Sequence, residues 1–244
     1  VTPEIFLRLF FPMVTKEYAS KDMTFIKNIS KKIGKWILMI NLPAFFLMLL
    51  FPETIIYILF GEEYVIAANS LRILAFAALF SSLFSISNNL ISMVGKSKIL
   101  LYDVMIASAI TVILNLILIP IPRILWMDNS LGINGAAVAT AISFLIFNFL
   151  MFFQAKHYTK IIPLRRDMLN ILLSVSISIL LAILLKKIFY EGVLAFVIIS
   201  AVFIGTYILC LFFTKSFDKE DYEIIKFFKQ KINPHALLNE KNKA

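Results

Sequence analysis

Charged residues are scarce in this chain of 244 residues. Asp, Glu, Lys and Arg make up 16% of the sequence and hydrophobic residues make up 60%, whereas about a quarter of the residues in a typical soluble domain are charged. This composition leaves too little polar surface for a shell exposed to water. The single cysteine, Cys210, excludes an intrachain disulfide.

The sequence also lacks the short motifs of common catalytic and metal sites. It contains no G-x-x-x-x-G-K-[ST], no H-E-x-x-H, no paired Cys/His spacing and no G-x-S-x-G. An intramembrane enzyme would need a clustered nucleophile and base, and these spans supply none. We therefore expect no catalytic residue, no metal ligand and no cofactor.

Six apolar runs dominate the chain, and each approaches or exceeds the ~20 residues that a helix needs to cross a bilayer. They cover residues 33–51, 66–94, 99–121, 133–153, 168–185 and 193–213. We therefore predict an all-α fold, a polytopic transmembrane helix bundle with six full spans. No stretch has the pattern of a β-strand. Between the first two runs, Pro52 and Glu53 predict a short helix over 52–60 that ends at Gly61.

Basic residues in the connecting segments gather on one side of these spans. The first loop carries Lys16, Lys21, Lys27, Lys31, Lys32 and Lys35, and further bases follow the second span, the fourth span and the last span. The positive-inside rule then predicts a multi-pass protein of the cytoplasmic membrane with a cytoplasmic C-terminus. Lys186 and Lys187 break the pattern, and we expect them to reach the outer headgroups. The net charge of +9 does not indicate nucleic acid, because the bases lie in short loops and in the tail.

Polar side chains recur inside two neighbouring spans. Ser81, Ser85 and Asn89 are four residues apart, with Asn88 and Ser92 beside them, and Asp103, Ala107, Thr111 and Asn115 repeat that spacing. Each set lies on one helix face. The tight turn at 95–98 predicts that the two stripes face each other. Two interpretations stay open: interhelical hydrogen bonds that hold the helices together, or a hydrophilic wall of a transport cavity.

Three charged residues lie within or close to apolar stretches. We expect Asp103 to be a carboxylate near the membrane surface that pairs with Lys96 or Lys98. The alternative is a role in a proton relay. Arg72 is interpreted as an interfacial or gating charge. Arg8, among apolar neighbours, suits a phosphate ligand, although an arginine near a helix end could also reach the headgroups.

Two further patterns concern helix shape and packing. Asn41 and Pro43 lie in the middle of the first span, where proline removes a backbone hydrogen bond and permits a hinge or shapes the packing. Gly135, Ala139 and Ser143 form a face of small residues, which predicts close helix packing.

Several motifs, in order and spacing, resemble the C-terminal half of the polysaccharide-biosynthesis flippases. These Wzx-type proteins belong to the MATE/MOP superfamily, which also contains the MATE multidrug exporters and the lipid II flippase. The motifs are LFGEEY at 59–64, AANSLRIL at 67–74, GKSK at 95–98, LNLILIP at 114–120, GINGAAVAT at 132–140 and TKSFDKED at 214–221.

The resemblance implies a fourteen-helix protein with two six-helix lobes and two final helices. Residues 1–14 would be the end of helix 8, with Arg8 facing the cavity. Residues 15–155 would be helices 9 to 12, and residues 156–214 would be helices 13 and 14, beside a groove for a lipid tail. Residues 215–244 would be an amphipathic cytoplasmic tail. The chain opens at Val1, so we expect a missing N-terminal lobe, or else an alternative start.

The function predicted is translocation of a polyprenyl-(pyro)phosphate-linked oligosaccharide across the cytoplasmic membrane by alternating access. The candidate cavity residues are Arg8, Asn41, Ser85, Asn88, Asn89, Thr111 and Asn115. The partners would be the lipid bilayer, the lipid-linked glycan and the N-terminal lobe. Two alternatives stay open: a MATE-type cation-coupled multidrug antiporter, which would need an acidic cavity, and a non-transporting membrane scaffold.

Overall fold

The computed structural model describes residues 23–124, 127–128, 132–161, 168–188, 192–214 and 216. These residues contain six helices long and apolar enough to cross a membrane. They are α2 (Met23–Leu50), α4 (Ala68–Met93), α5 (Ser97–Leu118), α6 (Ile133–Thr159), α7 (Met168–Ile188) and α8 (Val193–Phe213). The all-α, multi-pass prediction is confirmed. The predicted helix end at 1–14, Arg8 within it, and the predicted tail beyond residue 216 lie outside the described residues and stay predictions.

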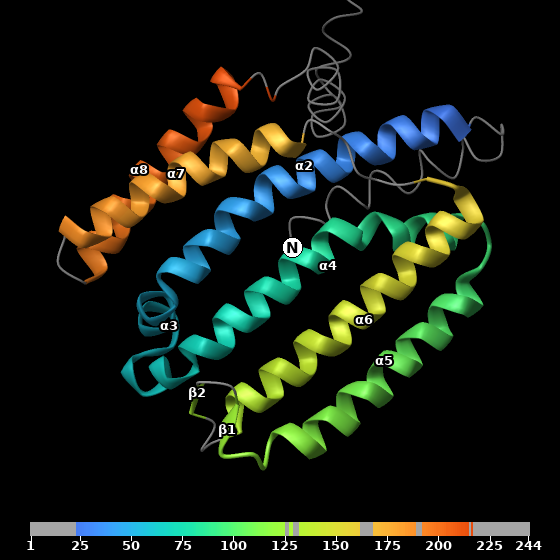
Figure 1. Ribbon diagram of the computed structural model, residues 1–244, viewed down its shortest axis with the longest axis horizontal. Helices are drawn as coiled ribbons and strands as arrows, with labels where there is room; N and C mark the ends of the chain where they lie inside the picture. The colour runs from blue at the N-terminus through green and yellow to red at the C-terminus, as the bar shows by residue number, and fades with distance from the viewer. Residues whose placement is uncertain are drawn as a thin grey trace, which may run out of the picture.

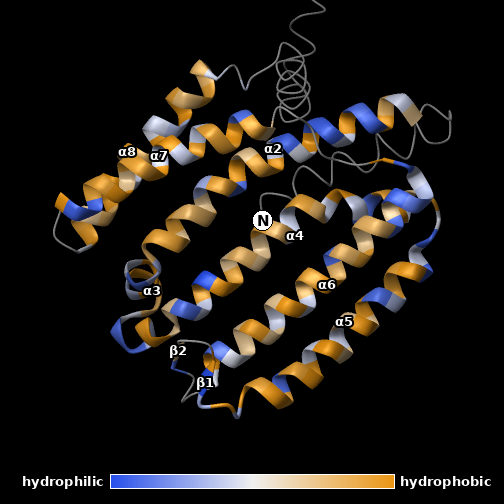
Figure 2. Cartoon of the chain, in the orientation of Figure 1, coloured by the Kyte–Doolittle hydropathy of each residue, from blue (hydrophilic) through white to orange (hydrophobic). Residues whose placement is uncertain are grey.

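The six helices form a row in the order α8, α7, α2, α4, α6, α5 (Figure 1), in agreement with the helix pairs that touch most extensively. Hydrophobic residues cover most of each helix, and hydrophilic residues gather toward the helix ends (Figure 2). Large apolar side chains such as Leu116, Leu180 and Phe212 are exposed. A surface of this kind suits acyl chains rather than water.

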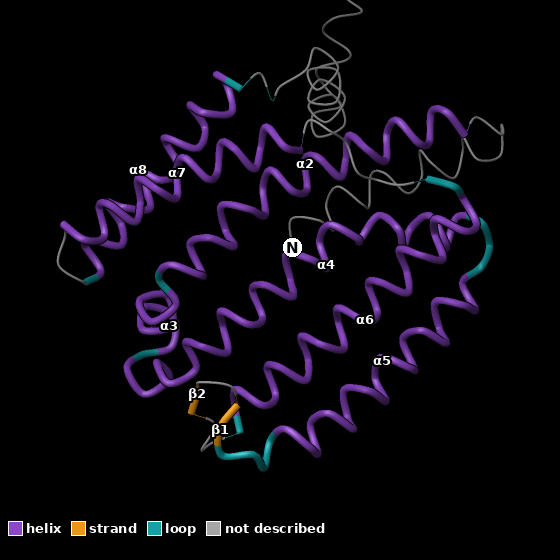
Figure 3. The backbone as a smooth tube through the Cα atoms, in the orientation of Figure 1, coloured by secondary structure: helices purple, strands orange, loops and turns teal. Residues whose placement is uncertain are grey.

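Two short helices cover one end of α2 and α4, and both appear as tight coils in Figure 3. α3 (Pro52–Phe60) follows α2 after the single residue Phe51, and the 3₁₀ helix η1 (Glu62–Ala67) leads into α4. Gly61 ends α3 with φ +97°, and its amide donates to the Tyr57 carbonyl at 3.0 Å. The short helix predicted from Pro52 and Gly61 is confirmed.

The first predicted loop is partly wrong, because Lys27, Lys31, Lys32 and Lys35 lie on α2. Lysine is a good helix former, and its long aliphatic stem can lie along an apolar surface. The polar segment before residue 33 is therefore helical too, and α2 begins at Met23. Lys35 is 1% exposed.

We call the end of the bundle with Lys27, Lys96 and Lys156 the basic end, and the end with α3 the opposite end.

A small strand pair corrects the prediction that strands are absent. β1 (Arg123–Ile124) pairs with β2 (Met127–Asp128) in antiparallel register, Arg123 opposite Asp128. Strands of two residues are too short for alternation to be visible in the sequence. Gly132 follows with φ +69°, and a Cβ there would lie 2.7 Å from Ile119 Cγ2. The glycine therefore lets α5 and α6 approach closely at this end.

The face of small residues on α6 packs as predicted. Gly135, Ala139 and Ser143 are all buried, the last two at 0% exposure. α6 makes its most extensive helix contact with α4. Small side chains allow backbones in a membrane to approach each other, which increases the dispersion contacts between helices.

Candidate functional site

α4 carries a stripe of partly exposed polar residues. Arg72 and Leu83 lie toward α2 and α3, whereas Ser70 and Phe84 lie toward α6. At about 100° per residue, Ser85 and Asn89 fall between these two sides, and Ser81 and Ser92 lie nearer the α6 side. This group, which we call the α4 polar stripe, consists of Ser81, Ser85, Asn89 and Ser92, and all four are partly exposed.

The stripe does not bond to neighbouring helices through the contacts seen in the described residues. Ser85 Oγ donates to Ser82 O at 2.7 Å, Asn89 Nδ2 donates to Ser85 O at 3.1 Å, and Ser92 Oγ donates to Asn88 O at 3.1 Å. These bonds lie within α4, and no hydrogen bond from these three side chains to another helix is seen among the described residues. The hydroxyl and amide oxygens keep acceptor capacity. The stripe can therefore accept hydrogen bonds from a hydroxyl-rich ligand.

Asn41, the candidate on α2, behaves in the same way. Its Nδ2 donates to the Ile37 carbonyl at 3.0 Å, and the side chain is half-buried. On α5, Thr111 Oγ1 donates to Ala107 O at 2.8 Å. Each side chain satisfies one donor locally, which lowers the cost of a polar group in a membrane helix.

The two polar stripes do not face each other, which contradicts the prediction. α6 lies between α4 and α5 and packs extensively against both (Figure 1). Asp103 is the one buried residue of α5, and Thr111 and Asn115 are partly buried on an otherwise largely exposed helix. The α5 stripe therefore turns toward α6. A tight turn makes helices neighbours in sequence, but the small residues of α6 let it insert between them.

Asp103 does not form the predicted pair with Lys96 or Lys98 in the part of the chain that the structure describes. It is 4% exposed, and its Oδ2 has no hydrogen-bond partner. Lys98 lies five residues earlier, about 140° around the helix, and Lys96 Nζ instead lies 5.7 Å from the centre of the Tyr158 ring. Separation around the helix therefore keeps these charges apart.

Further buried polar atoms without a hydrogen-bond partner occur nearby. A group of them lies in the half of the bundle toward the basic end: Ser30 Oγ, Ser87 Oγ, Asn88 Oδ1, Asp103 Oδ2 and Gln154 Oε1. An unsatisfied buried polar group costs roughly 1–3 kcal/mol. Asn88 and Asp103 were expected from the sequence as site residues. The others were not, because single serines are common in membrane helices and Gln154 stands close to the basic residues after its span.

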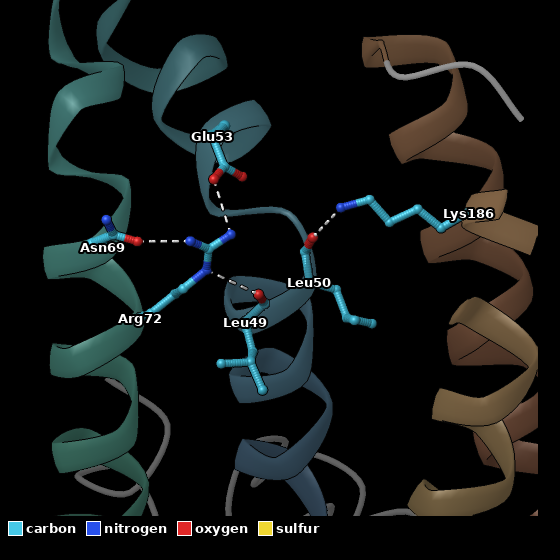
Figure 4. A network of polar contacts seen from close by, with 6 residues as sticks. All are labelled: Leu49, Leu50, Glu53, Asn69, Arg72 and Lys186. Carbon is cyan, nitrogen blue, oxygen red and sulfur yellow. Dashed lines mark hydrogen bonds and ion pairs between the residues drawn. The ribbon is translucent and has the colours of Figure 1, made fainter. Parts of the chain in front are cut away.

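Arg72 and Lys186 share one structural task at the opposite end, as Figure 4 shows. Arg72 Nη2 pairs with Glu53 Oε1 at 2.9 Å, and Arg72 Nη1 donates to Asn69 Oδ1 at 2.8 Å. Its Nε donates to the Leu49 carbonyl at 3.5 Å, and Lys186 Nζ donates to the Leu50 carbonyl at 3.0 Å. Lys186 was expected to reach the lipid headgroups, but its ammonium group instead bonds to a backbone carbonyl of α2.

These two carbonyls lack their usual donors because α2 is interrupted. In an unbroken helix Leu49 O and Leu50 O would bond the amides four residues ahead, but α3 restarts at Pro52 with Phe51 as its N-cap. The last carbonyls of a helix need outside partners. Arg72 and Lys186 supply them, which gives both cations a reason to lie at a base-poor end.

A third side chain donates a hydrogen bond to a carbonyl of α2, next to the internal proline of this helix. Pro43 has no amide hydrogen, so Met39 O has no backbone donor four residues ahead. Tyr207 of α8 donates to this carbonyl at 2.9 Å, and Tyr207 is 3% exposed. This contact was not predicted from the sequence. The available signal was a tyrosine within the apolar α8, because a buried tyrosine hydroxyl usually has a partner.

Most of the interhelical hydrogen bonds recorded for the described residues lie toward helix ends. Ser70 Oγ donates to Asn134 Oδ1 at 2.9 Å and joins α4 to α6. Ser174 and Thr214 join α7 to the end of α8 at 3.0 Å. A cleft of about 670 Å³ opens at the opposite end, lined by Glu53, Thr54, Tyr57, Glu62, Val65, Gly192 and Val193. No group of acidic, histidine or cysteine side chains suited to a metal occurs in the described ranges.

Parts of this sequence are similar to known proteins. Residues 11–121 match the MatE family. The uncharacterized membrane protein MJ1068 of Methanocaldococcus jannaschii is 27% identical over 205 residues, which cover 83% of this chain and 38% of that protein. The "probable low-salt glycan biosynthesis flippase Agl15" of Haloferax volcanii is 34% identical over 137 residues, 56% of this chain and 27% of that protein.

The chain therefore spans well under half the length of each of these relatives. No solved structure matches the sequence. The match to the MatE family and the similarity to a glycan flippase agree with the row of membrane-spanning helices. These matches support a flippase-like member of the MATE/MOP superfamily.

Proposed function

We propose that this chain is part of a transporter that moves a polyprenyl-(pyro)phosphate-linked oligosaccharide across the cytoplasmic membrane. The observation that carries the proposal is the similarity to a glycan-biosynthesis flippase over 137 residues, together with a partly exposed stripe of hydroxyl and amide groups on α4. A sugar presents many hydroxyl donors, and the stripe offers acceptors spaced along α4.

The physical task is to carry sugar hydroxyls and phosphates across about 30 Å of hydrocarbon. A hydrophilic face on α4 would shield the glycan while its polyprenyl tail stays in lipid. Asn41 on α2 and Asn88 on α4 are the further residues that we propose for this face. Thr111 and Asn115 turn toward α6, so we assign them a supporting role and propose that they contact no cargo.

The chain would contribute one wall of a two-lobed cavity. Because it covers 38% and 27% of its relatives, we propose that an N-terminal lobe supplies the facing wall. Residues 1–14, with Arg8 as a base toward the phosphate, would complete that cavity. The basic end would lie in the cytoplasm under the positive-inside rule, and so would the C-terminus.

A cation-coupled multidrug antiporter is the competing transporter. Such a protein needs carboxylates in its cavity, whereas the α4 polar stripe has none and Asp103 is buried on the α5 side that faces α6. A scaffold without transport would use its polar stripe for contacts between helices. The bonds of the stripe within α4 give no support to that alternative.

The test is translocation of a fluorescent polyprenyl-diphosphate oligosaccharide in vesicles that contain the complete protein. Asn89→Leu and Ser85→Leu should lower the translocation rate by about tenfold or more, since each would remove an acceptor from the route. Ser176→Leu is the matched control, because Ser176 also bonds within its own helix but is exposed on α7. A wild-type protein that moves no lipid-linked glycan yet exports an organic cation would overturn the proposal in favour of the antiporter.

A further inference from the structure

The α7–α8 pair contacts α2 on both sides of Pro43. On the basic side, Tyr207 Oη donates to Met39 O at 2.9 Å. On the other side, Lys186 Nζ donates to Leu50 O at 3.0 Å, and the Phe51 and Phe196 rings lie 5.4 Å apart. One pair of helices therefore holds the two segments of α2 that a change of angle at Pro43 would move.

Tyr207 bonds to the carbonyl that Pro43 leaves without a backbone donor. Tyr207 and Met39 are 3% and 6% exposed and belong to an apolar cluster with Leu42 and Phe203. A hydroxyl there has few places to bond, and the one carbonyl it meets is the one that Pro43 leaves without an amide donor. If residue 43 carried an amide hydrogen, the helix itself would satisfy Met39 O.

We propose that α2 flexes at Pro43 and that Tyr207 is the positioning residue that couples this flexing to the α7–α8 pair. This inference rests on the proposed transport function, because it assigns a moving part to it. In the arrangement described here Tyr207 is bonded to Met39 O. In the second arrangement α2 turns at Pro43, that bond opens, and α7–α8 shifts relative to α4, α5 and α6.

The experiment is a double-mutant cycle in the complete protein, read by distances between spin labels. Leu116→Cys on α5 and Leu194→Cys on α8, both 74% exposed, carry the labels in a background in which Cys210 and any other cysteine of the complete protein are replaced by serine. In the wild-type protein we expect two distance populations. Tyr207→Phe removes one hydroxyl and should deplete the described population about 3- to 20-fold, which corresponds to the ~0.6–1.7 kcal/mol measured for hydrogen bonds between membrane helices.

Pro43→Ala restores a donor for Met39 O. We expect it to leave one population, and Tyr207→Phe should then change nothing further. Tyr102→Phe is the matched control, because Tyr102 is 63% exposed on α5, and it should leave both populations as they are. A loss of stability alone would lower the unfolding temperature of Tyr207→Phe without changing the ratio of populations, and that result would contradict the proposal.

Two other results would also overturn it. Equal shifts for Tyr207→Phe with and without Pro43→Ala would mean that the hydroxyl does not serve the proline break. Two populations that persist in Pro43→Ala would place the hinge elsewhere. The distances do not depend on the cargo, so a protein that flexes as described but moves no glycan would sink the proposed function and leave this inference standing.

Discussion

Two regions of the bundle are held together in different ways. In the region of α4, α6 and α5, helices meet through small residues such as Ala139 and Gly132. In the region of α2, α7 and α8, side chains from α7 and α8 donate to carbonyls of α2, as Tyr207 and Lys186 do. The first region depends on close packing, and the second depends on donors placed where the backbone of α2 is interrupted.

The difference indicates which region is rigid and which can move. Close packing of small residues has one well-fitting arrangement, since dispersion contacts fall off steeply with distance. A donor bonded to a freed carbonyl can be released and formed again, because the helix on either side stays intact. Substitutions that add volume should therefore harm the first region most, and substitutions that remove donors should harm the second.

The largest effect is expected at Gly132. Gly132→Ala would place a Cβ 2.7 Å from Ile119 Cγ2 and 3.2 Å from Ile119 O, at φ +69°. The left-handed conformation costs about 1–2 kcal/mol for a residue with a side chain, and relief of the contact adds to this. We expect roughly 3 kcal/mol of destabilisation, seen as a lower midpoint of thermal unfolding in detergent. Gly95→Ala, with φ +74° and no atom within 4 Å of the added Cβ, isolates the conformational part, and equal losses at the two glycines would show that the contact with Ile119 is unimportant.

Ala139→Leu should have the next largest effect. Ala139 is 0% exposed on the face of α6 that carries Gly135 and Ser143, and overpacking typically costs about 1–3 kcal/mol. Ala78→Leu adds the same volume at an exposed position of α4 and should be nearly neutral. Thermal unfolding of both variants measures the difference. If Ala139→Leu is tolerated as well as Ala78→Leu, the first region is not held by close packing.

Lys186→Met removes a donor from the second region and keeps most of the side-chain volume. A hydrogen bond from a charged group contributes about 1.5–3 kcal/mol, so we expect about 2 kcal/mol of destabilisation from the loss of the bond to Leu50 O. Lys187→Met, at an exposed neighbouring position, changes the same charge and should be close to neutral. Equal effects would mean that the charge near the membrane surface matters and the carbonyl does not.

The smallest effect is expected for the bond between Ser70 and Asn134, the buried 2.9 Å contact that joins α4 to α6. Its loss in Ser70→Ala should cost about 0.6 kcal/mol, the average for such bonds in membrane helices. Unfolding of Ser70→Ala, Asn134→Ala and the double variant measures the coupling energy. A coupling above that of Lys186 would reverse the comparison between the two regions.

The parts of the fold that local chemistry determines could be predicted from the sequence. The apolar runs gave the spans, Pro52 with Gly61 gave α3, and the spacing of Gly135, Ala139 and Ser143 gave the packed face of α6. Helix ends next to lysines were less predictable. Lysine is compatible with both a helix and a loop, so the lysines after Met23 did not mark where α2 begins.

Contacts between helices distant in sequence could not be read from the sequence. The turn at Gly95 makes α4 and α5 consecutive, yet the insertion of α6 between them follows from the shape of three helices together. The spacing of Ser85 and Asn89 put them on one face, but only coordinates could show that their bonds stay within α4. The contact of Tyr207 with Met39 O joins residues 168 positions apart, beyond the reach of any local pattern.

The most direct test of the proposed glycan route is the water accessibility of the α4 polar stripe in the complete protein. Cysteines at Ser85 and Asn89 are probed with a membrane-impermeant thiol reagent in a background in which Cys210 and any other cysteine are replaced by serine. Ser143→Cys, at 0% exposure between helices, and Ser176→Cys, exposed on α7, provide the packed and lipid-facing references. We predict that Ser85→Cys and Asn89→Cys react and that both references stay unmodified. Stripe cysteines as unreactive as the references would contradict a hydrophilic route along α4.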